Sequence, residues 1–282
     1  MLANLNEVMA KLEARRVMLP GFDIAGGQSD FLLGVLAACE AARCPALLLV
    51  WAPGADYVGM EMCADLLRSA AARASVPVIA HLDHAKTEQE IETALKLGFR
   101  SVMFDASDRP LEENIRRTRA MVELAHAHGA TIEGELGRFG QEESGDGAAE
   151  LTDPGQAAAF VRGTGVDLLA PAVGNAHGFY KRPPQLRWDL IEAIATAAGV
   201  PLSLHGGTGL PIADLLQAAK LGVRKLNIAT QLHKDFSDAL VSAAGAGDPK
   251  RSSWRKILQT GRDAIRQTAG RYISDLGAGG LV

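Results

Sequence analysis

The stretch VPVIAHLDHAKTEQEIETALKLGF, residues 76–99, contains one complete strand–helix unit. Its apolar run Val78–Ala80 predicts a buried strand. The pattern Thr87-x-x-Glu90 is a capping box, which predicts that a helix begins there. Gly98 predicts the end of that helix, because glycine readily adopts the left-handed conformation that follows a last turn. Between the strand and the helix lies the tetrapeptide HLDH (residues 81–84), so two imidazoles and a carboxylate follow the apolar run directly.

The same unit recurs along the chain, and its repetition predicts the fold. The triplet Thr152-Asp153-Pro154 puts a helix cap before a proline, and a glycine stops a helix just before the next strand at 97–99, 128–130 and 221–223. Eight such units predict a parallel sheet closed as a (β/α)8 TIM barrel, for which about 250 residues is the usual size. The expected strands are Val17–Leu19, Ala46–Val50, Val78–Ala80, Ser101–Phe104, Thr131–Ile132, Asp167–Ala170, Leu202–Leu204 and Lys225–Ile228.

An open, doubly wound sheet is the alternative fold. It is less favoured because no expected strand is followed by the G-x-G-x-x-G turn that dinucleotide sites use. No interdomain linker or low-complexity tract interrupts the sequence. We therefore expect a single (β/α)8 barrel domain over residues 1–282, with a C-terminal helical extension over about residues 236–282.

The composition is that of a globular protein, and it argues against several partners. Of the 282 residues 48% are hydrophobic, and the formal charge of −4, with acids and bases interleaved, differs from the basic surface that binds nucleic acid. No apolar run reaches the length of about 18 residues that spans a membrane. Charged residues such as Glu7 and Arg15 stand where a signal peptide would be apolar. We expect a cytoplasmic protein without nucleic-acid or membrane partners, and buried free thiols at Cys39, Cys44 and Cys63.

Polar side chains stand where most of the expected strands end. In a (β/α)8 barrel the carboxyl ends of all strands meet at one mouth, where active sites form. The sequence therefore predicts a single site at this mouth. The residues that follow the third to the eighth strand are Asp83 and His84; Asp105 and Ser107; Glu133 and Glu135; Asn175, His177 and Gly178; His205-Gly206-Gly207-Thr208-Gly209; and Asn227.

Three of these histidines predict a metal site. His84, His177 and His205 come from strands three, six and seven, and three imidazoles with an open fourth position are typical of catalytic zinc. Any one histidine on its own would be read as a cap or a core residue. We do not expect the other histidines to bind the metal. His126 and His128 should close a helix, His233 should lie on the surface, and His81 should either support the site or fill the barrel.

The glycine-rich segment HGGTGLP, residues 205–211, predicts a phosphate site. Its backbone N–H groups precede a helix opened by Pro211, and barrels often bind phosphate after strands seven and eight. Gly178, next to His177, adds another N–H that a ligand can approach closely. Tight turns need glycine in any case, so the position beside His205 is what strengthens this prediction.

The residues near each carboxylate in the sequence indicate its candidate role. Asp83 precedes a proposed ligand and is best placed to exchange a proton with a substrate hydroxyl. Glu142 and Glu143 lie in the long polar loop RFGQEESGDGAAE, which is either a lid or a solvated acidic loop. Asp105 and Glu135 are candidates for holding imidazole N–H groups, for a second metal position, or for hydrogen bonds at a strand end.

At this point the chain resembles the class II, metal-dependent ketose-bisphosphate aldolases, the family of fructose- and tagatose-bisphosphate aldolases. The resemblance rests on blocks that keep their order and spacing from about residue 75 to 235, with a weaker LPGFDIA near the N-terminus. These blocks are HLDHAKTEQEIETALKLGFRSVMFDAS, IEGELGRFGQEE, LTDPGQAAAFVRGTGVDLLAPAVGNAHGFYK, PLSLHGGTGLP and LGVRKLNIATQL.

The resemblance implies a role for each matching position. It implies that the enzyme, a lyase, cleaves a ketose 1,6-bisphosphate to dihydroxyacetone phosphate and glyceraldehyde 3-phosphate through a zinc-stabilised enediolate. It also implies a homodimer or homotetramer, and room for a second divalent or a monovalent cation. The implied roles are zinc ligands at His84, His177 and His205; acid–base residues at Asp83 and Glu143; a second metal position at Asp105 and Glu135; phosphate contacts at Gly178, Gly206, Thr208 and Thr230; and an enediolate contact at Asn227.

Several residues differ from the family pattern, and they stand at positions expected to contact the substrate. Asp23 stands where the family usually has Asn, and Trp51 occupies a strand end that often carries small or polar groups. Thr208 is conservative for Ser, and Ala229 resembles the tagatose branch. Lys250 or Arg251 is a candidate for a second phosphate contact.

Several alternatives therefore stay open. The first is an aldolase acting on another phosphorylated sugar or sugar acid. The second is a noncatalytic barrel subunit that partners an aldolase, and the third is a metal-assisted hydrolase or isomerase. The metal is open too, since three imidazoles also accept cobalt, manganese or iron.

Overall fold

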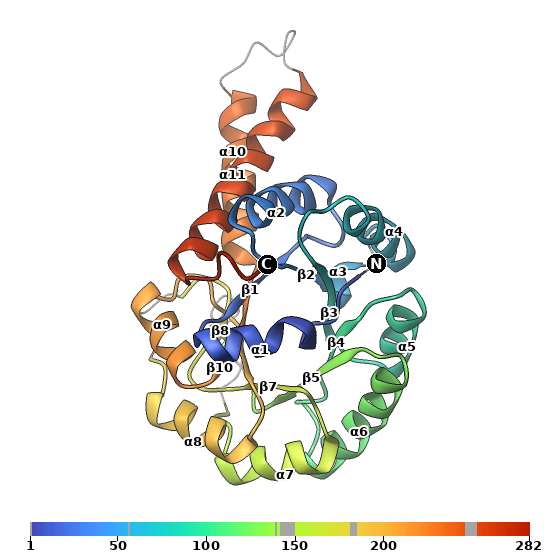
Figure 1. Ribbon diagram of the computed structural model, residues 1–282, viewed down its shortest axis with the longest axis vertical. Coiled ribbons are helices and arrows are strands. Elements are labelled where there is room, and N and C mark those ends of the chain that lie inside the picture. Colours follow the sequence, from blue (N-terminus) through green and yellow to red (C-terminus); the bar gives the residue numbers. More distant parts are fainter. Residues whose placement is uncertain (1, 56, 139, 142–149, 181–184, 246–252) are drawn as a thin grey trace.

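Eight parallel strands close into a barrel in the computed structural model (Figure 1), which describes residues 2–55, 57–138, 140–141, 150–180, 185–245 and 253–282. Because β1 pairs with both β10 and β2, the sheet has no open edge. The expected (β/α)8 barrel is confirmed, and the open doubly wound sheet is excluded. Around the barrel the order is β1 (Leu19–Asp23), β10 (Val223–Ile228), β9 (Leu202–Leu204), β7 (Leu168–Pro171), β5 (Thr131–Leu136), β4 (Ser101–Phe104), β3 (Val78–Ala85) and β2 (Ala46–Trp51).

All eight strands lie where the apolar runs predicted them, with differences at their ends. The first begins at Leu19, not Val17, because helix α1 (Asn6–Arg15) ends in a left-handed residue, Arg16, and the Val17 N–H still bonds to the α1 carbonyl of Leu12 at 3.1 Å. β3 and β5 run further than their apolar runs because their ladders continue. Trp51 pairs in register with Asp83, for example, so the polar residues of these strands lie inside the sheet. A short extra pair, β6 (Gly140–Gln141) and β8 (Ala176–His177), was not predicted.

Helices surround the barrel, and α1 crosses its amino-terminal end (Figure 1). The Asn6 N–H of α1 donates to Thr131 Oγ1 at 3.3 Å and its side-chain amide contacts Asp167, residues at the amino-terminal ends of β5 and β7. The carboxyl-terminal end of the barrel therefore faces the opposite side. The surrounding helices are α2 (Ser29–Ala42), α3 (Ala52–Ala55), α4 (Met60–Ala71), α5 (Glu88–Lys96), α6 (Leu111–Ala127), α7 (Pro154–Thr164), α8 (Trp188–Ala198) and α9 (Ile212–Lys220).

Two further helices, α10 (Thr230–Gly245) and α11 (Trp254–Asp275), run side by side away from the barrel (Figure 1). α11 is joined to α2 by the guanidinium of Arg262, which donates to Asp30 Oδ1 from Nε at 3.0 Å and from Nη2 at 2.6 Å. α10 starts two residues after β10, so its first turn stays at the carboxyl end of the barrel. The single domain with a helical extension from about residue 236 stays a prediction.

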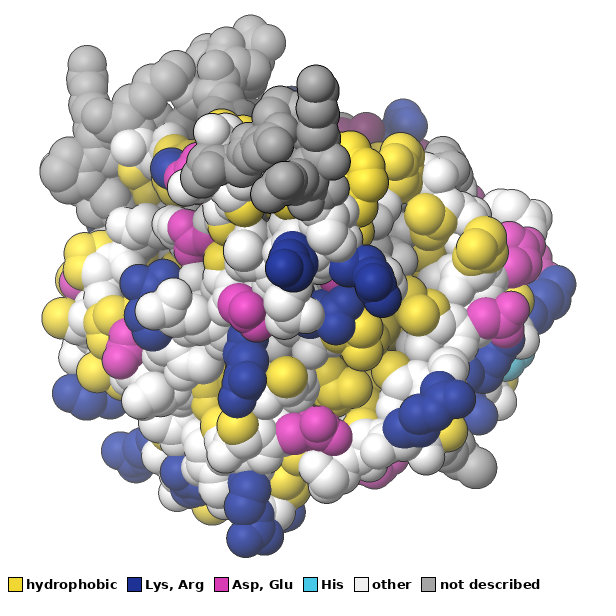
Figure 2. All heavy atoms as spheres, turned by 90° about the horizontal axis from the view of Figure 1, so that it is seen from above, with side chains coloured by type: hydrophobic (Ala, Val, Ile, Leu, Met, Phe, Trp, Pro, Cys, Tyr) yellow, Lys and Arg dark blue, Asp and Glu magenta, His cyan; other side chains and the backbone are white. Residues whose placement is uncertain are grey.

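The surface and the cysteines agree with the composition. Figure 2 shows basic and acidic side chains dispersed over one face of the molecule, as their interleaving in the sequence predicts. Among the described residues no helix is both long and apolar enough to cross a membrane. Cys39, Cys44 and Cys63 are buried and free, as expected.

The capping box that predicted α5 is present, and it gives a test of the local sequence signal. Thr87 Oγ1 accepts from the Glu90 N–H at 3.3 Å, and Glu90 Oε2 accepts from the Thr87 N–H at 2.8 Å. We expect Thr87→Ala to lower the free energy of unfolding by about 1 kcal/mol. Urea denaturation followed by circular dichroism measures this. The control Thr87→Ser keeps the hydroxyl and should stay close to the wild type, and an equal loss in both variants would contradict the assignment.

Candidate active site

A cavity of about 700 Å³ opens at the carboxyl ends of the strands. His205 is fully buried beside it. Glu142, Glu143, Lys250 and Arg251 lie outside the described residues, so their predicted roles have no structural description. Of the other predicted site residues, those that line the cavity are Asp83, His84, Asp105, Glu135, His177, Gly178, Gly206, Thr208, Asn227 and Thr230.

The three predicted metal-binding histidines converge from three different parts of the barrel. His84 lies near the end of β3, His177 in the short strand β8, and His205 directly after β9. His84 Nε2 and His205 Nδ1 are 3.0 Å apart, and the three residues offer ligand atoms that all lie within 4.8 Å of one another. His84 has a φ of 53°, an uncommon conformation for a residue with a side chain, at the point where the β3–β4 register shifts. Such strain is typical of functional sites.

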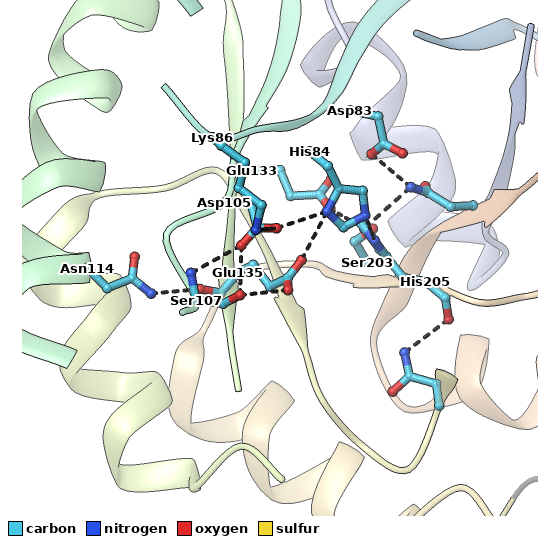
Figure 3. A network of polar contacts seen from close by, with 12 residues as sticks. Asp83, His84, Lys86, Asp105, Ser107, Asn114, Glu133, Glu135, Ser203 and His205 are labelled. Atoms are coloured by element: carbon cyan, nitrogen blue, oxygen red, sulfur yellow. Dashed lines mark hydrogen bonds and ion pairs between the residues drawn. The ribbon is translucent and has the colours of Figure 1, made fainter. Parts of the chain in front are cut away.

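Buried carboxylates fix which imidazole nitrogens face the centre (Figure 3). His84 Nδ1 lies 3.1 Å from Asp105 Oδ2, and His205 Nε2 lies 2.8 Å from Glu133 Oε1. A carboxylate accepts the N–H of each ring, so when both rings are neutral the opposite nitrogens, His84 Nε2 and His205 Nδ1, present lone pairs to each other. Two lone pairs this close repel unless a cation or a proton lies between them. The donor set therefore fits a divalent metal ion, with the second nitrogen of each ring held as metal-binding histidines require.

The charges around the imidazoles also favour a cation at the centre of the site. Burial lowers the pKa of His84, but the Asp83 charge and the hydrogen bond to Asp105 outweigh it and raise the pKa to about 9. Burial and the positive charge of His84 lower the pKa of His177 to about 3, so this imidazole is neutral at pH 7. The pocket thus favours one positive charge at its centre and keeps the neighbouring ring available as a ligand.

A second group of possible ligands lies beside the first. His84, Asp105 and Glu135 also bring one ligand atom each within 4.8 Å of the others. Ser107 Oγ links the two carboxylates, donating within 2.7 Å of Asp105 Oδ1 and 3.0 Å of Glu135 Oε1. Burial and the Asp105 charge raise the pKa of Glu135 to about 8.

A buried lysine organises the floor of the site. The Lys225 ammonium is fully buried, forms an ion pair with Glu133 Oε2 at 2.9 Å and donates to Asn227 Oδ1 at 2.6 Å. Because Lys225 occupies the Asn227 carbonyl oxygen, the amide nitrogen faces Asp83 and donates to its Oδ1 at 3.0 Å. Sequence reasoning missed Lys225 and gave Glu133 no role. The available signal was a lysine in a buried strand two residues before Asn227, hence on the same face of the strand.

Asp83 is held as an ionised carboxylate. Burial would raise its pKa, but the His84 charge, the nearby His81 imidazole and the Lys225 charge hold the pKa of Asp83 well below its ordinary value. His81 is fully buried, its Nδ1 lies 2.7 Å from Ser101 Oγ, and its Nε2 lies 3.7 Å from Asp83 Oδ1. His81 was expected either to support the site or to fill the barrel. It does both, because it is buried in the barrel and lies beside Asp83.

The glycine-rich loop after β9 approaches the segment around Ala176 too closely for a side chain at Gly206. Gly206 has a φ of 66°, and a Cβ there would lie 1.9 Å from the Ala176 carbonyl oxygen, so only glycine fits. Thr208 Oγ1 accepts from the Gln231 N–H at 3.3 Å, at the start of α10. Tyr180, which sequence reasoning missed, joins the two loops: its hydroxyl donates to the Gly206 carbonyl oxygen and accepts from the Ala176 N–H, both at 3.0 Å.

The remaining histidines agree with expectation, and one of them also lines the cavity. His233 was expected on the surface; its side chain is 46% exposed, but it lines the cavity, and its Nε2 lies 2.9 Å from Asp23 Oδ2. The reason is that α10 begins at the barrel mouth and carries its first turn there. His126 and His128 lie at the end of α6, where they bond Asp167 and the Leu124 carbonyl oxygen.

Comparison with known proteins gives consistent matches over the whole chain. Residues 3–281 match the family described as Fructose-bisphosphate aldolase class-II. A fructose-bisphosphate aldolase from Geobacillus stearothermophilus is 39% identical over 259 residues, 89% of each chain. A probable fructose-bisphosphate aldolase from Bacillus subtilis (strain 168) is 38% identical over 247 residues, 85% of each chain. Among solved structures, the YdjI aldolase from Escherichia coli K12 is similar with a TM-score of 0.87 at 32% identity, covering 99% of both chains.

The Lys225–Glu133 pair gives a test of the buried network. Lys225→Met leaves the Glu133 carboxylate buried without its cation, so we expect the free energy of unfolding to fall by about 3–5 kcal/mol. The double variant Lys225→Met/Glu133→Gln removes the unpaired charge and should recover a large part of that loss. Chemical denaturation of the wild type and both variants measures the effect. A single variant as stable as the wild type would rule out this ion pair.

Proposed function

The chain belongs to the class-II fructose-bisphosphate aldolase family and is a lyase, and from this premise we propose that it cleaves a phosphorylated ketose between C3 and C4. The products are dihydroxyacetone phosphate and an aldehyde. The names of the relatives make ketose 1,6-bisphosphates the first candidates, namely fructose or tagatose 1,6-bisphosphate, with glyceraldehyde 3-phosphate as the aldehyde. The observation that carries the proposal is that three imidazoles converge beside an ionised Asp83 in one cavity.

We infer that the imidazoles of His84, His177 and His205 hold a divalent cation, with zinc as the first candidate. A bound cation supplies Lewis acidity toward the ketone oxygen of the substrate. Asp105 and Glu135, together with His84, form the position for a second cation. Cobalt, manganese and iron are compatible with the same imidazoles.

Asp83 and Asn227 perform the proton transfer and the positioning at the reacting carbons. The Asp83 carboxylate takes the proton of the C4 hydroxyl, the C3–C4 bond breaks, C4 becomes the aldehyde carbon, and the electron pair stays with the C3 fragment as an enediolate. The Asn227 amide, which Lys225 orients toward Asp83, is placed beside these atoms. Glu143, the proposed donor of the proton that C3 then takes up, lies outside the described residues.

The C1 phosphate fits the loop that follows β9 and the start of α10. Gly178, Gly206, Thr208 and Thr230 line this part of the cavity. The first turn of α10 adds the positive end of a 16-residue helix dipole. Holding the phosphate there leaves the ketone and the C4 hydroxyl to reach the imidazoles and Asp83.

A second candidate substrate is another phosphorylated sugar or sugar acid, and it is favoured by Asp23 and Trp51 in the cavity wall. The lyase assignment removes the alternatives of a noncatalytic subunit and of a hydrolase or isomerase. The cytoplasmic location and the homodimer or homotetramer remain part of this proposal.

The proposal is tested by metal content and by release of dihydroxyacetone phosphate. We expect His205→Ala to lose bound metal and to lower the cleavage rate by more than about 100-fold, because the ligand set is incomplete. The matched control is His126→Ala, which removes an exposed histidine outside the cavity and should leave both readouts unchanged. EDTA should abolish wild-type cleavage, and added zinc, cobalt or manganese should restore it. Unchanged cleavage in His205→Ala, or in the presence of EDTA, would contradict the proposal.

A further inference from the structure

One wall of the cavity carries polar and aromatic groups that the chemistry above does not use. It is formed by β1 and β2, which lie between β10 and β3 in the barrel. Asp23 at the end of β1 and Trp51 at the end of β2 both line the cavity. Asp23 is buried, and Trp51 is 47% exposed.

The Asp23 carboxylate is fixed by contacts from two directions. Its Oδ1 accepts from the Ala25 N–H at 3.0 Å, and its Oδ2 accepts from His233 Nε2 at 2.9 Å. The His233 ring is itself held by an edge-on contact with Phe31, with ring centroids 5.3 Å apart. The carboxylate therefore cannot swing out of the cavity easily, and the His233 N–H is already donated to it.

The Trp51 indole is also supported. A Cβ at Gly54 would lie 3.0 Å from Trp51 Cε3, so the ring rests on the turn of α3. A supported aromatic face beside a carboxylate is the combination that suits a sugar chain, because the indole covers C–H groups while the carboxylate accepts hydrogen bonds from hydroxyls.

Barrel register places this wall beside the part of the substrate beyond C4. The C4 hydroxyl must reach Asp83, and Trp51 is the register partner of Asp83 in β2, with Asp23 on the next strand, β1. On the other side of Asp83, toward β4 and β5, Asp105 and Glu135 occupy the space next to His84. Among the residues that the structure describes, the lysine and arginine on that side are Lys86, which pairs with Asp105, and Arg138, which donates to the Asp108 carbonyl oxygen at 3.1 Å.

From this placement we infer that Asp23 and Trp51 select a substrate whose tail beyond C4 is a hydroxylated chain without a phosphate. The inference rests on the proposed function, and it names the substrate class as a ketose 1-phosphate that releases an unphosphorylated polyhydroxy aldehyde. A phosphate next to the fixed Asp23 carboxylate is repelled at short range, whereas a hydroxyl gains a hydrogen bond.

The test runs the reaction in the direction of synthesis, with metal-loaded enzyme and dihydroxyacetone phosphate. The two aldehydes compared, glyceraldehyde and glyceraldehyde 3-phosphate, differ only in the phosphate. We expect the wild type to have a kcat/KM at least about 10-fold higher for glyceraldehyde, and Asp23→Asn, which is isosteric and uncharged, to shift the ratio at least about 10-fold toward the phosphorylated aldehyde. The control Asp108→Asn makes the same charge change on the far side of the cavity and should leave the ratio unchanged.

Failure of the inference is distinguishable from failure of the proposed function. Exchange of the C3 proton of dihydroxyacetone phosphate with deuterated water needs no aldehyde, so it reports the proposed chemistry alone. Absence of exchange would overturn the proposed function and the inference with it. Exchange combined with a wild-type preference for glyceraldehyde 3-phosphate, with an unchanged ratio in Asp23→Asn, or with no consumption of either aldehyde, would overturn the inference only.

Discussion

The contacts between buried carboxylates and imidazoles are the interactions on which the site depends. Glu133 and Asp105 each accept from the outer nitrogen of a histidine, and this turns His205 Nδ1 and His84 Nε2 toward each other at 3.0 Å. Glu133 can remain ionised at full burial because Lys225 neutralises it, and the charge of Lys225, with hydrogen bonds from His205, holds the pKa of Glu133 below its ordinary value against the effect of burial. The same lysine orients Asn227, so one buried cation acts on both the carboxylate that holds His205 and the amide beside Asp83.

Barrel closure makes this arrangement possible, because it brings the ends of eight strands to one mouth. Different strands also contribute different parts of the cavity. The ends of β3 and β9 and the short strand β8 provide the imidazoles and Asp83; in the proposed function the loops after β9 and β10 hold the phosphate, and β1 and β2 form the wall that faces the rest of the substrate. On this proposal, a change of substrate can arise from residues on β1 and β2, while the chemistry on the other strands is retained. Asp23 and Trp51 stand at the positions where such a change acts.

The sequence predicted most of the fold, because the signals of the barrel are local. Each apolar run, the capping box at Thr87 and the helix-stopping glycines need only neighbouring residues, so all eight strands were placed, with errors confined to ends such as Leu19. The strand-end rule also brought His84, His177, His205 and Asp83 to one cavity. It could not find contacts between residues far apart in sequence: Lys225 with Glu133, Tyr180 with Gly206, or His233 with Asp23. His233 lies on the exposed side of a helix, and only the position of that helix at the barrel mouth brings it into the cavity.

The most direct test of this account is the position of the metal in crystals grown with zinc, located by anomalous diffraction at the zinc edge. The account predicts one peak bound by His84 Nε2, His205 Nδ1 and His177 at about 2.0–2.1 Å, with Asp105 and Glu133 still on the opposite nitrogens of the first two rings. No peak among these three imidazoles, or a peak held by Asp105 and Glu135 without His177 and His205, would contradict it.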